Sequence, residues 1–223
     1  MPILLRIDSS PMGETSISRQ LTGEFTQKWL RANPQGKLIT RDLTTITIPV
    51  IDSAWIAANK TPKESRTEQQ NDLLRLSSEF TAELLDADEY VIGLPMHNWG
   101  PSASFKLWMD QIIRIGETVF FTPSGLKGML DKKQVTVFIS AGRSFVPVSL
   151  DAPSNYLEPW LRTFFGNLGV KNMRFFIADG TNSVNYGKMD RVEFLLPHID
   201  AIQKLFTVDQ SCQTENVLIH VDP

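Results

Sequence analysis

Ile3-Leu4-Leu5-Arg6-Ile7 runs directly into Asp8-Ser9-Ser10-Pro11-Met12-Gly13, and this junction decides the fold. The apolar run predicts a β-strand, and the polar run predicts the turn that ends it. After the turn, apolar residues recur every four positions, at Ile17, Leu21, Phe25 and Trp29. That spacing places them on one face of a helix. The chain is therefore predicted to open with a strand, a polar turn and an amphipathic helix.

The same alternation continues along the chain. Short runs rich in Val, Ile and Leu predict further strands at residues 37–43, 90–94, 135–139 and 174–178. Segments of helical period separate them, one of which begins with the capping-box pattern Thr67 to Gln70. Alternating strands and helices predict a parallel sheet covered by helices on both faces. We expect an α/β, flavodoxin-like doubly wound sheet of five strands in the order 2-1-3-4-5.

Two segments stand apart from this pattern. Residues 44–66 are predicted to be a long irregular connection with helical patches. After it, helices of the regular pattern are expected at about 102–115, 156–168 and 195–206. The predicted domain spans residues 1–206, and residues 207–223 form a C-terminal extension. Within the extension, Val217-Leu218-Ile219 can form a small edge strand or pack on a neighbouring molecule.

Composition narrows the possible functions. Lys and Arg number 22 against 25 Asp and Glu, giving a net charge of -3 with the signs interspersed, so no nucleic-acid surface is expected. No stretch approaches the roughly 20 apolar residues that cross a bilayer, so a soluble, cytoplasmic protein without membrane contact is expected. The single cysteine, Cys212, excludes an intrachain disulfide, and its thiol is not expected to act as a nucleophile. His198 and His220 lack a ligand spacing, so no metal is expected.

In such a sheet, ligands bind outside the carboxyl ends of the strands, where the strand order reverses. That point lies between the first and third strands, with the fourth beside it. Three loops should therefore form the site, at residues 8–18, 95–101 and 140–147. We refer to them as the first, second and third loops.

The first loop is rich in glycine and hydroxyl side chains, namely Ser9, Ser10, Gly13, Thr15, Ser16 and Ser18. It leads into a helix whose first amides lack intrahelical partners and attract anions. The pattern favours phosphate binding, although an ordinary helix N-cap explains one serine. The chain contains neither G-x-G-x-x-G nor G-x-x-x-x-G-K-[ST], so a monophosphate fits better than a pyrophosphate or triphosphate.

The second loop, Pro95-Met96-His97-Asn98-Trp99-Gly100-Pro101, combines a thioether, an imidazole, an amide and an indole. These groups suit a flat heteroaromatic ligand, whereas the alternative is a turn whose Trp99 covers the core. In the third loop, Gly142 allows close backbone approach, and Arg143 can stabilise an anionic reduced ring or be a solvated surface arginine.

These three loops resemble those of the FMN-dependent NADH:quinone oxidoreductases, the bacterial azoreductases, over residues 4 to about 206. The matching features are Asp8-Ser9-Ser10 with Ser16 and Ser18, Pro95-Met96-x-Asn98-aromatic, and Ser140-x-Gly142. The resemblance implies one non-covalent FMN per subunit, with its phosphate on the first loop and its ring on the other two. The implied contacts are Ser10, Ser16, Ile17, Ser18, Met96, His97, Asn98, Trp99, Ser140, Ala141, Gly142 and Arg143.

The resemblance also implies an activity. NADH or NADPH would reduce the flavin, and a quinone would take two electrons, or an azo compound would be cleaved to amines, in ping-pong order. His97 is a candidate proton donor. The family forms homodimers, and Phe120, Phe121 and Trp55 are candidate walls of the substrate cleft, ordinary core aromatics being the alternative. The rival function is a flavodoxin-like electron carrier or FMN-binding module without substrate turnover of its own.

Overall fold

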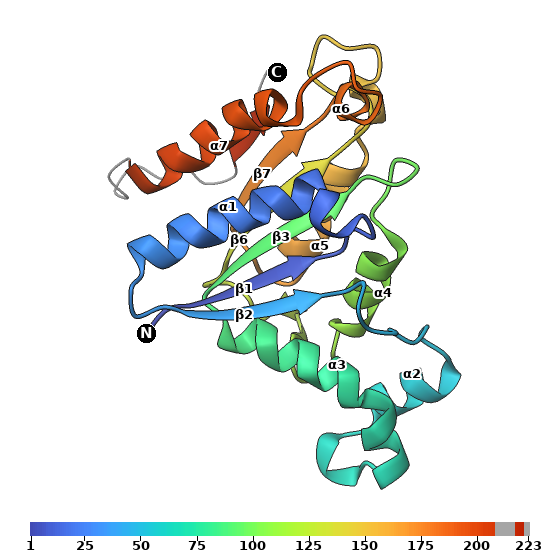
Figure 1. Cartoon of the computed structure of the whole chain (residues 1–223). Coiled ribbons are helices and arrows are strands. Elements are labelled where there is room, and N and C mark those ends of the chain that lie inside the picture. Colours follow the sequence, from blue (N-terminus) through green and yellow to red (C-terminus); the bar gives the residue numbers. More distant parts are fainter. Residues whose placement is uncertain (208–216, 221–223) are drawn as a thin grey trace.

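A parallel sheet with helices on both faces organises the molecule (Figure 1). The computed structural model describes residues 1–207 and 217–220. Within them the sheet has six strands in the order β2-β1-β3-β6-β7-β8, and every neighbouring pair is parallel. The strands are β1 (Ile3–Asp8), β2 (Lys37–Asp42), β3 (Glu89–Pro95), β6 (Gln134–Ser140), β7 (Asn172–Ala178) and β8 (Val217–His220).

The predicted five-stranded sheet is wrong by one strand. β8, in the segment expected as an extension, pairs with β7 in a register that sets Val217 against Arg174. The edge-strand alternative for Val217-Leu218-Ile219 is therefore the one observed, and the edge of β7 provides the hydrogen-bonding partner that so short a strand needs. Cys212 lies outside the described residues.

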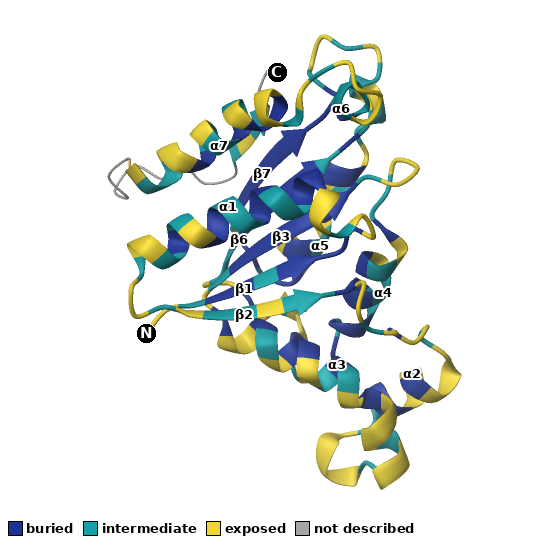
Figure 2. Ribbon diagram, viewed as in Figure 1, coloured by how far each residue is buried: buried dark blue, intermediate teal, exposed yellow. Residues whose placement is uncertain are grey.

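One face of the sheet is covered by α1 (Ile17–Ala32) and α7 (Arg191–Thr207). The predicted stripe of α1 is confirmed, because its four apolar residues are all buried against this face. Successive strand residues point to opposite faces, so Val91 of β3 packs here while its neighbours Tyr90 and Ile92 pack on the other side. The central strands are consequently buried on both faces, as their continuous apolar runs predicted (Figure 2).

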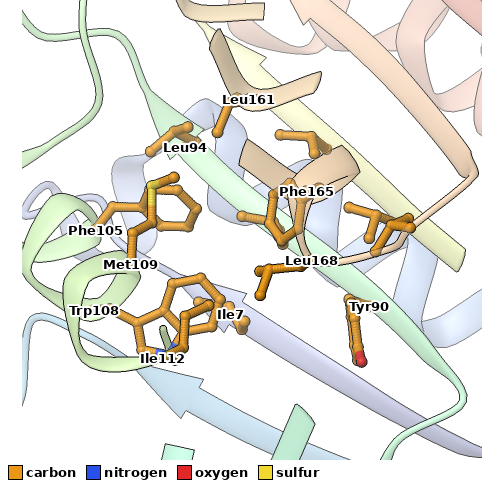
Figure 3. Close-up of a cluster of buried hydrophobic side chains, with 14 of the residues drawn as sticks. Ile7, Tyr90, Leu94, Phe105, Trp108, Met109, Ile112, Leu161, Phe165 and Leu168 are labelled. Carbon is orange, nitrogen blue, oxygen red and sulfur yellow. The ribbon is translucent and has the colours of Figure 1, made fainter. Parts of the chain in front are cut away.

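The other face is covered by α3 (Glu68–Asp86), α4 (Ala103–Gln111) and α5 (Leu157–Asn167). Figure 3 shows Trp108 and Met109 of α4 and Phe165 of α5 in the apolar cluster at this face. The capping box of α3 is confirmed, since Thr67 and Gln70 each accept a hydrogen bond from the other's backbone amide, at 3.2 and 3.0 Å.

The remaining elements lie in the connections. They are α2 (Ser53–Lys60), α6 (Asn182–Asn185), three single 3-10 turns at Gly13–Thr15, Lys63–Ser65 and Ala152–Ser154, and the antiparallel hairpin of β4 (Val119–Thr122) and β5 (Gly125–Gly128). The helix predicted to reach residue 115 ends at Gln111.

Arg114, a buried arginine, lies shortly after the C-terminal end of α4. The fully buried Arg114 guanidinium donates to Asn59 at 3.1 Å, Ser77 at 2.8 Å and Glu117 at 2.6 Å. It thereby ties α2 and α3 to the segment that precedes β4. Among the described residues no helix has the length and apolar character needed to span a bilayer.

Candidate functional site

The three loops meet at the carboxyl edge of β1, β3 and β6. They enclose a cavity of about 320 Å³, which we call the larger cavity. The first loop, the second loop, the third loop and the segment after β7 all contribute to it. The lining residues are Ser10, Met12, Thr15, Ser16, Ile17, Pro95, Met96, His97, Ser140, Gly142, Thr181, Asn182 and Asn185. The predicted meeting of the loops is therefore observed.

Local hydrogen bonds shape the first loop. The Ser16 hydroxyl caps α1 by accepting from the Arg19 amide at 3.3 Å, and it lies 3.2 Å from the hydroxyl of the buried Ser18. Ser9 donates to the Gly93 carbonyl at 3.1 Å. The N-cap interpretation thus holds for Ser16, whose side chain also lines the larger cavity together with that of Ser10. The open amides at the start of α1 add donors at the same place.

Two arginines lie against the first loop. Arg19 donates to the Ser10 carbonyl at 3.4 Å and pairs with Asp42 at 2.7 Å, while Arg191, from the start of α7, donates to the Thr15 carbonyl at 2.7 Å. Neither was expected from the sequence, and Arg191 lies far away along the chain. Because Asp42 neutralises Arg19, Arg191 is the one of the two that adds positive charge to that of the helix N-terminus and favours an anion at this end of the cavity.

Behind the loop, the carboxylate of Asp8 is 1% exposed and pairs with Arg6 at 2.8 Å and Thr22 at 2.7 Å. Burial raises the pKa of Asp8, and the neighbouring Arg6 charge opposes that rise. A Cβ at Gly93 would lie 2.7 Å from an Asp8 carboxylate oxygen, so β3 requires glycine where it passes this pair.

The second loop is a tight hairpin turn. His97 and Gly100 exchange backbone hydrogen bonds of 2.9 and 3.0 Å, and the residues between them have positive φ, 49° at Asn98 and 63° at Trp99. Such a turn ordinarily takes Asn-Gly, and a bulky residue in the left-handed region costs about 1–3 kcal/mol. Trp99 is 50% exposed, so it does not serve as a cover for the core.

The third loop is clamped from behind by the segment that follows β7. The carbonyls of Ala141, Gly142 and Arg143 accept hydrogen bonds of 3.0, 3.2 and 3.0 Å from the amides of residues 181, 182 and 180. The buried carboxylate of Asp179 accepts from the Phe145 amide and from the Ser144 hydroxyl. The loop backbone is therefore fixed by contacts to residues about 35–40 positions later.

A second cavity of about 230 Å³, the smaller cavity, opens between the second and third loops. It shares Met96 and Gly142 with the larger cavity. Its lining residues are Met96, Asn98, Trp99, Gly142, Arg143 and Phe145. The larger cavity, with hydroxyl and amide side chains among its lining residues, thus lies next to a smaller one that has two aromatic side chains and a single cationic one among its described lining residues.

Several predicted residues lie elsewhere. Ser18 and Ala141 are buried and do not line either cavity, and Trp55 packs with Ala58 and Leu74 while its indole donates to Gln111 at 2.9 Å. Phe120 and Phe121 lie on β4, 39% and 73% exposed, and also do not line these cavities.

Sequence reasoning missed Thr181, Asn182 and Asn185. The available signal was their position after the fifth predicted strand, whose carboxyl end shares the edge of the sheet with the other loops. Within the described residues there is no cluster of three or more His, Cys, Asp or Glu side chains suited to a metal ion.

The chain matches a protein family described as having a flavodoxin-like fold, over residues 3–196. It is 59% identical to FMN-dependent NADH:quinone oxidoreductase 3 of Burkholderia lata, across 91% of this chain and 98% of the relative. It is 41% identical to the FMN-dependent NADH:quinone oxidoreductase of Acidobacterium capsulatum, across 92% and 98%.

Among solved structures, an FMN-dependent NADH-azoreductase of Bacillus anthracis in complex with FMN superposes with a TM-score of 0.80 at 22% identity, covering 93% of this chain and 98% of that one. This likeness supports the fold, and the sequence relatives establish the family. The chain belongs to the FMN-dependent NADH:quinone oxidoreductases of flavodoxin-like fold.

Proposed function

We propose that this protein is an FMN-dependent oxidoreductase that takes electrons from NADH, reduces quinones by two electrons and cleaves aromatic azo compounds to amines. The observation that carries the proposal is the pair of adjacent cavities at the carboxyl edge of the sheet, the larger one bordered by the hydroxyl-rich first loop and the smaller one by Trp99 and Phe145. A mononucleotide with a phosphate at one end and a flat ring at the other matches that pair. The sequence relatives are named for the same cofactor and reaction.

The chemistry of the first loop fits the FMN phosphate. Ser10 and Ser16 line the larger cavity next to Ile17 and Ser18, whose amides lack intrahelical partners, so Ser18 would contribute its backbone rather than its buried side chain. Charge-assisted hydrogen bonds contribute about 1.5–3 kcal/mol each, so several together exceed the helix-dipole contribution of about 0.3–1 kcal/mol. Arg191 would add positive charge beside this phosphate site, whereas the charge of Arg19 is compensated by Asp42.

The second and third loops fit the isoalloxazine ring. Met96, Asn98 and Trp99 would lie along it, with the third-loop backbone at Gly142 against its edge. When bound, FMN supplies the hydride and electron transfer, and the protein positions the reactants and excludes water. NADH, or NADPH, and the acceptor would use the same cavity in turn, which implies ping-pong kinetics.

His97 is proposed as the proton donor to the reduced acceptor. Its side chain lines the larger cavity and is exposed, on the rim rather than in the core. Replacement of His97 by Phe should lower azo and quinone turnover and change its pH dependence. Unaltered turnover at several pH values would remove His97 from the mechanism.

A homodimer is also proposed, in which a partner subunit completes the substrate cleft. The exposed Phe120 and Phe121 on the β4–β5 hairpin support this idea. We further propose a cytoplasmic location, which a chain with one cysteine in 223 residues favours.

The visible spectrum of the purified protein tests the function. A yellow flavin band should be present, disappear on anaerobic addition of NADH and return on addition of menadione. Protein that neither contains FMN nor binds added FMN would overturn the proposal. A flavin that NADH fails to reduce would favour the electron carrier or FMN-binding module instead.

A further inference from the structure

We propose that Asn182 holds the ribityl chain of FMN through its side-chain amide. This inference rests on the proposed function and assigns a residue to the one part of the cofactor for which that function names none. Asn182 is the first residue of α6, in the segment that follows β7, and it lies outside the contacts expected from the sequence.

The larger cavity lies between the places proposed for the two ends of FMN. The first loop borders it at Ser16, beside the proposed phosphate site, and the third loop borders both cavities at Gly142, beside the proposed edge of the ring. Asn182 lines the larger cavity and packs against Gly142. Since the ribityl chain connects the phosphate to the ring, it has to cross the cavity that Asn182 borders.

The position of Asn182 is fixed by its neighbours. Its backbone amide donates to the Gly142 carbonyl at 3.2 Å, and its own carbonyl accepts from the Tyr186 amide at 3.0 Å. A Cβ at residue 142 would lie 2.8, 3.1 and 3.1 Å from the Oδ1, Cγ and Nδ2 atoms of Asn182, so the side-chain amide lies against the glycine. Gly142 therefore leaves the space that this amide occupies.

The polar atoms of the Asn182 side chain are available to a ligand. The side chain is half-buried, yet no group in the described part of the chain forms a hydrogen bond with its Oδ1 or Nδ2 atom. The adjacent lining residues differ, because the Thr181 hydroxyl already donates to the Ala141 carbonyl at 3.0 Å and Asn185 is exposed. Asn182 thus combines a fixed position with unused hydrogen-bonding groups.

A neutral amide matches hydroxyl groups. It offers N–H donors and an oxygen acceptor, and each hydroxyl of a ribityl chain can both donate and accept. A phosphate would favour a cation or backbone amides, and a flat ring would favour aromatic or thioether surface, as at Trp99 and Met96 in the smaller cavity. The chemistry of Asn182 therefore favours the ribityl chain over either end of the cofactor.

Flavins that differ in one part test the proposal. The first comparison is between FMN and an analogue in which an unsubstituted alkyl chain of the same length joins the ring to the phosphate. The dissociation constant of each flavin for the FMN-free protein is measured by titration of flavin fluorescence. Asn182→Ala should raise the constant for FMN about tenfold and leave the constant for the analogue unchanged, because the analogue has no hydroxyl groups to lose.

Riboflavin provides the second comparison, because it keeps the hydroxyl groups and lacks the phosphate. Asn182→Ala should raise its dissociation constant by the same factor as that of FMN. An unchanged constant for riboflavin would assign Asn182 to the phosphate, and an equal loss for the analogue would assign it to the ring. Either result would overturn the proposal, and so would an unchanged affinity for FMN.

Ser183→Ala is the matched control. Ser183 is the next residue of α6, and its hydroxyl donates to the Gly180 carbonyl at 2.8 Å, but it lines neither cavity. This change disturbs the same short helix without altering a cavity wall, so the affinities for all the flavins should stay unchanged. A loss of FMN affinity equal to that of Asn182→Ala would show that both residues act through the fold of the segment, which would also overturn the proposal.

Failure of the proposed function looks different. In that case the unmodified protein would bind neither FMN nor riboflavin, or NADH would fail to reduce the bound FMN. An unmodified protein that binds FMN and is reduced by NADH, together with an Asn182→Ala variant of equal affinity, would overturn only the present inference.

Discussion

The first and third loops border one cavity but are held in place by different means. The first loop is organised by neighbours in sequence, as in the Ser16 cap on Arg19 and the 2.8 Å hydrogen bond from Thr15 to the Met12 carbonyl. The third loop is held by a segment about 35–40 residues later, through Asp179 and three backbone amides. The helix cap and the turn of the first loop are thus local, with distant contacts added by Gly93 and Arg191, whereas the backbone of the third loop is held by distant residues.

The largest effect on the first loop is expected from Ser16→Asp. Aspartate is as good an N-cap as serine, so the stability of α1 should be retained. Its negative charge would oppose the FMN phosphate, and FMN affinity should fall at least a thousandfold, about 4 kcal/mol. Fluorescence titration with FMN measures this loss.

Ser16→Ala is the counterpart, because it removes the cap and adds no charge. It should cost about 1 kcal/mol in the free energy of unfolding and lower FMN affinity less than Ser16→Asp does. Full FMN affinity in Ser16→Asp would place the phosphate elsewhere.

Asp179→Ala tests the tertiary clamp. It leaves the buried Phe145 amide and the Ser144 hydroxyl without their acceptor, which should cost about 3 kcal/mol in the free energy of unfolding. Urea denaturation of the FMN-free protein measures this cost. Asp151→Asn, on the exposed side of the same loop, should stay within about 0.5 kcal/mol of the unmodified protein. Equal effects of the two changes would show that Asp179 is not a clamp.

The pH dependence of the free energy of unfolding tests the same region, because His198 of α7 is buried near Asp179. Burial lowers the pKa of His198 to about 4, although the Asp179 charge opposes that shift. The unfolded chain protonates this histidine near its ordinary pKa of about 6.5, so it binds more protons than the folded protein between those values. The contribution of His198 to the free energy of unfolding is therefore fully present above about pH 6.5, and it is lost as the pH falls toward 4.

Between pH 7 and 5, His198 should account for about 2 kcal/mol of lost unfolding free energy. The measurement compares urea midpoints of the FMN-free protein with those of His198→Phe, in which this contribution should vanish. An identical pH slope in both proteins would contradict the assignment.

The smallest predicted effect concerns the contact of Gly142 with Asn182. A Cβ at residue 142 would lie 2.8 Å from the Asn182 side-chain oxygen, so Gly142→Ala should cost about 1 kcal/mol of unfolding free energy. In an Asn182→Ala background the same change should cost nothing. As a control, Gly166→Ala within α5 meets no atom within 4 Å and should stabilise the protein slightly.

Much of the fold was predictable because local patterns report burial. The continuous apolar runs of β3 and β6 and the stripe of α1 each record which faces are covered. The edge strand offered as one alternative for Val217-Leu218-Ile219 is observed as β8, whereas the β4–β5 hairpin escaped prediction because strands of four residues depend on their pairing partners.

For the site, sequence reasoning brought the three loops together but left out Asn182, Asn185 and Arg191. These residues reach the first and third loops through the return of the chain after β7, which no local motif announces. For Trp55 the sequence left a core and a cleft position open, since an aromatic residue in an irregular connection has no pattern that separates them, and the structure places it in a buried cluster.

The turn at Asn98 and Trp99 has a consequence for how this protein can change over generations. Glycine at residue 99 would relax the backbone and raise the melting temperature, yet it would remove the indole from the smaller cavity. Thermal stability therefore favours glycine at residue 99, whereas ligand preference favours tryptophan. A library selected for thermal resistance alone should drift toward glycine there, and its survivors should have lost the indole from the smaller cavity.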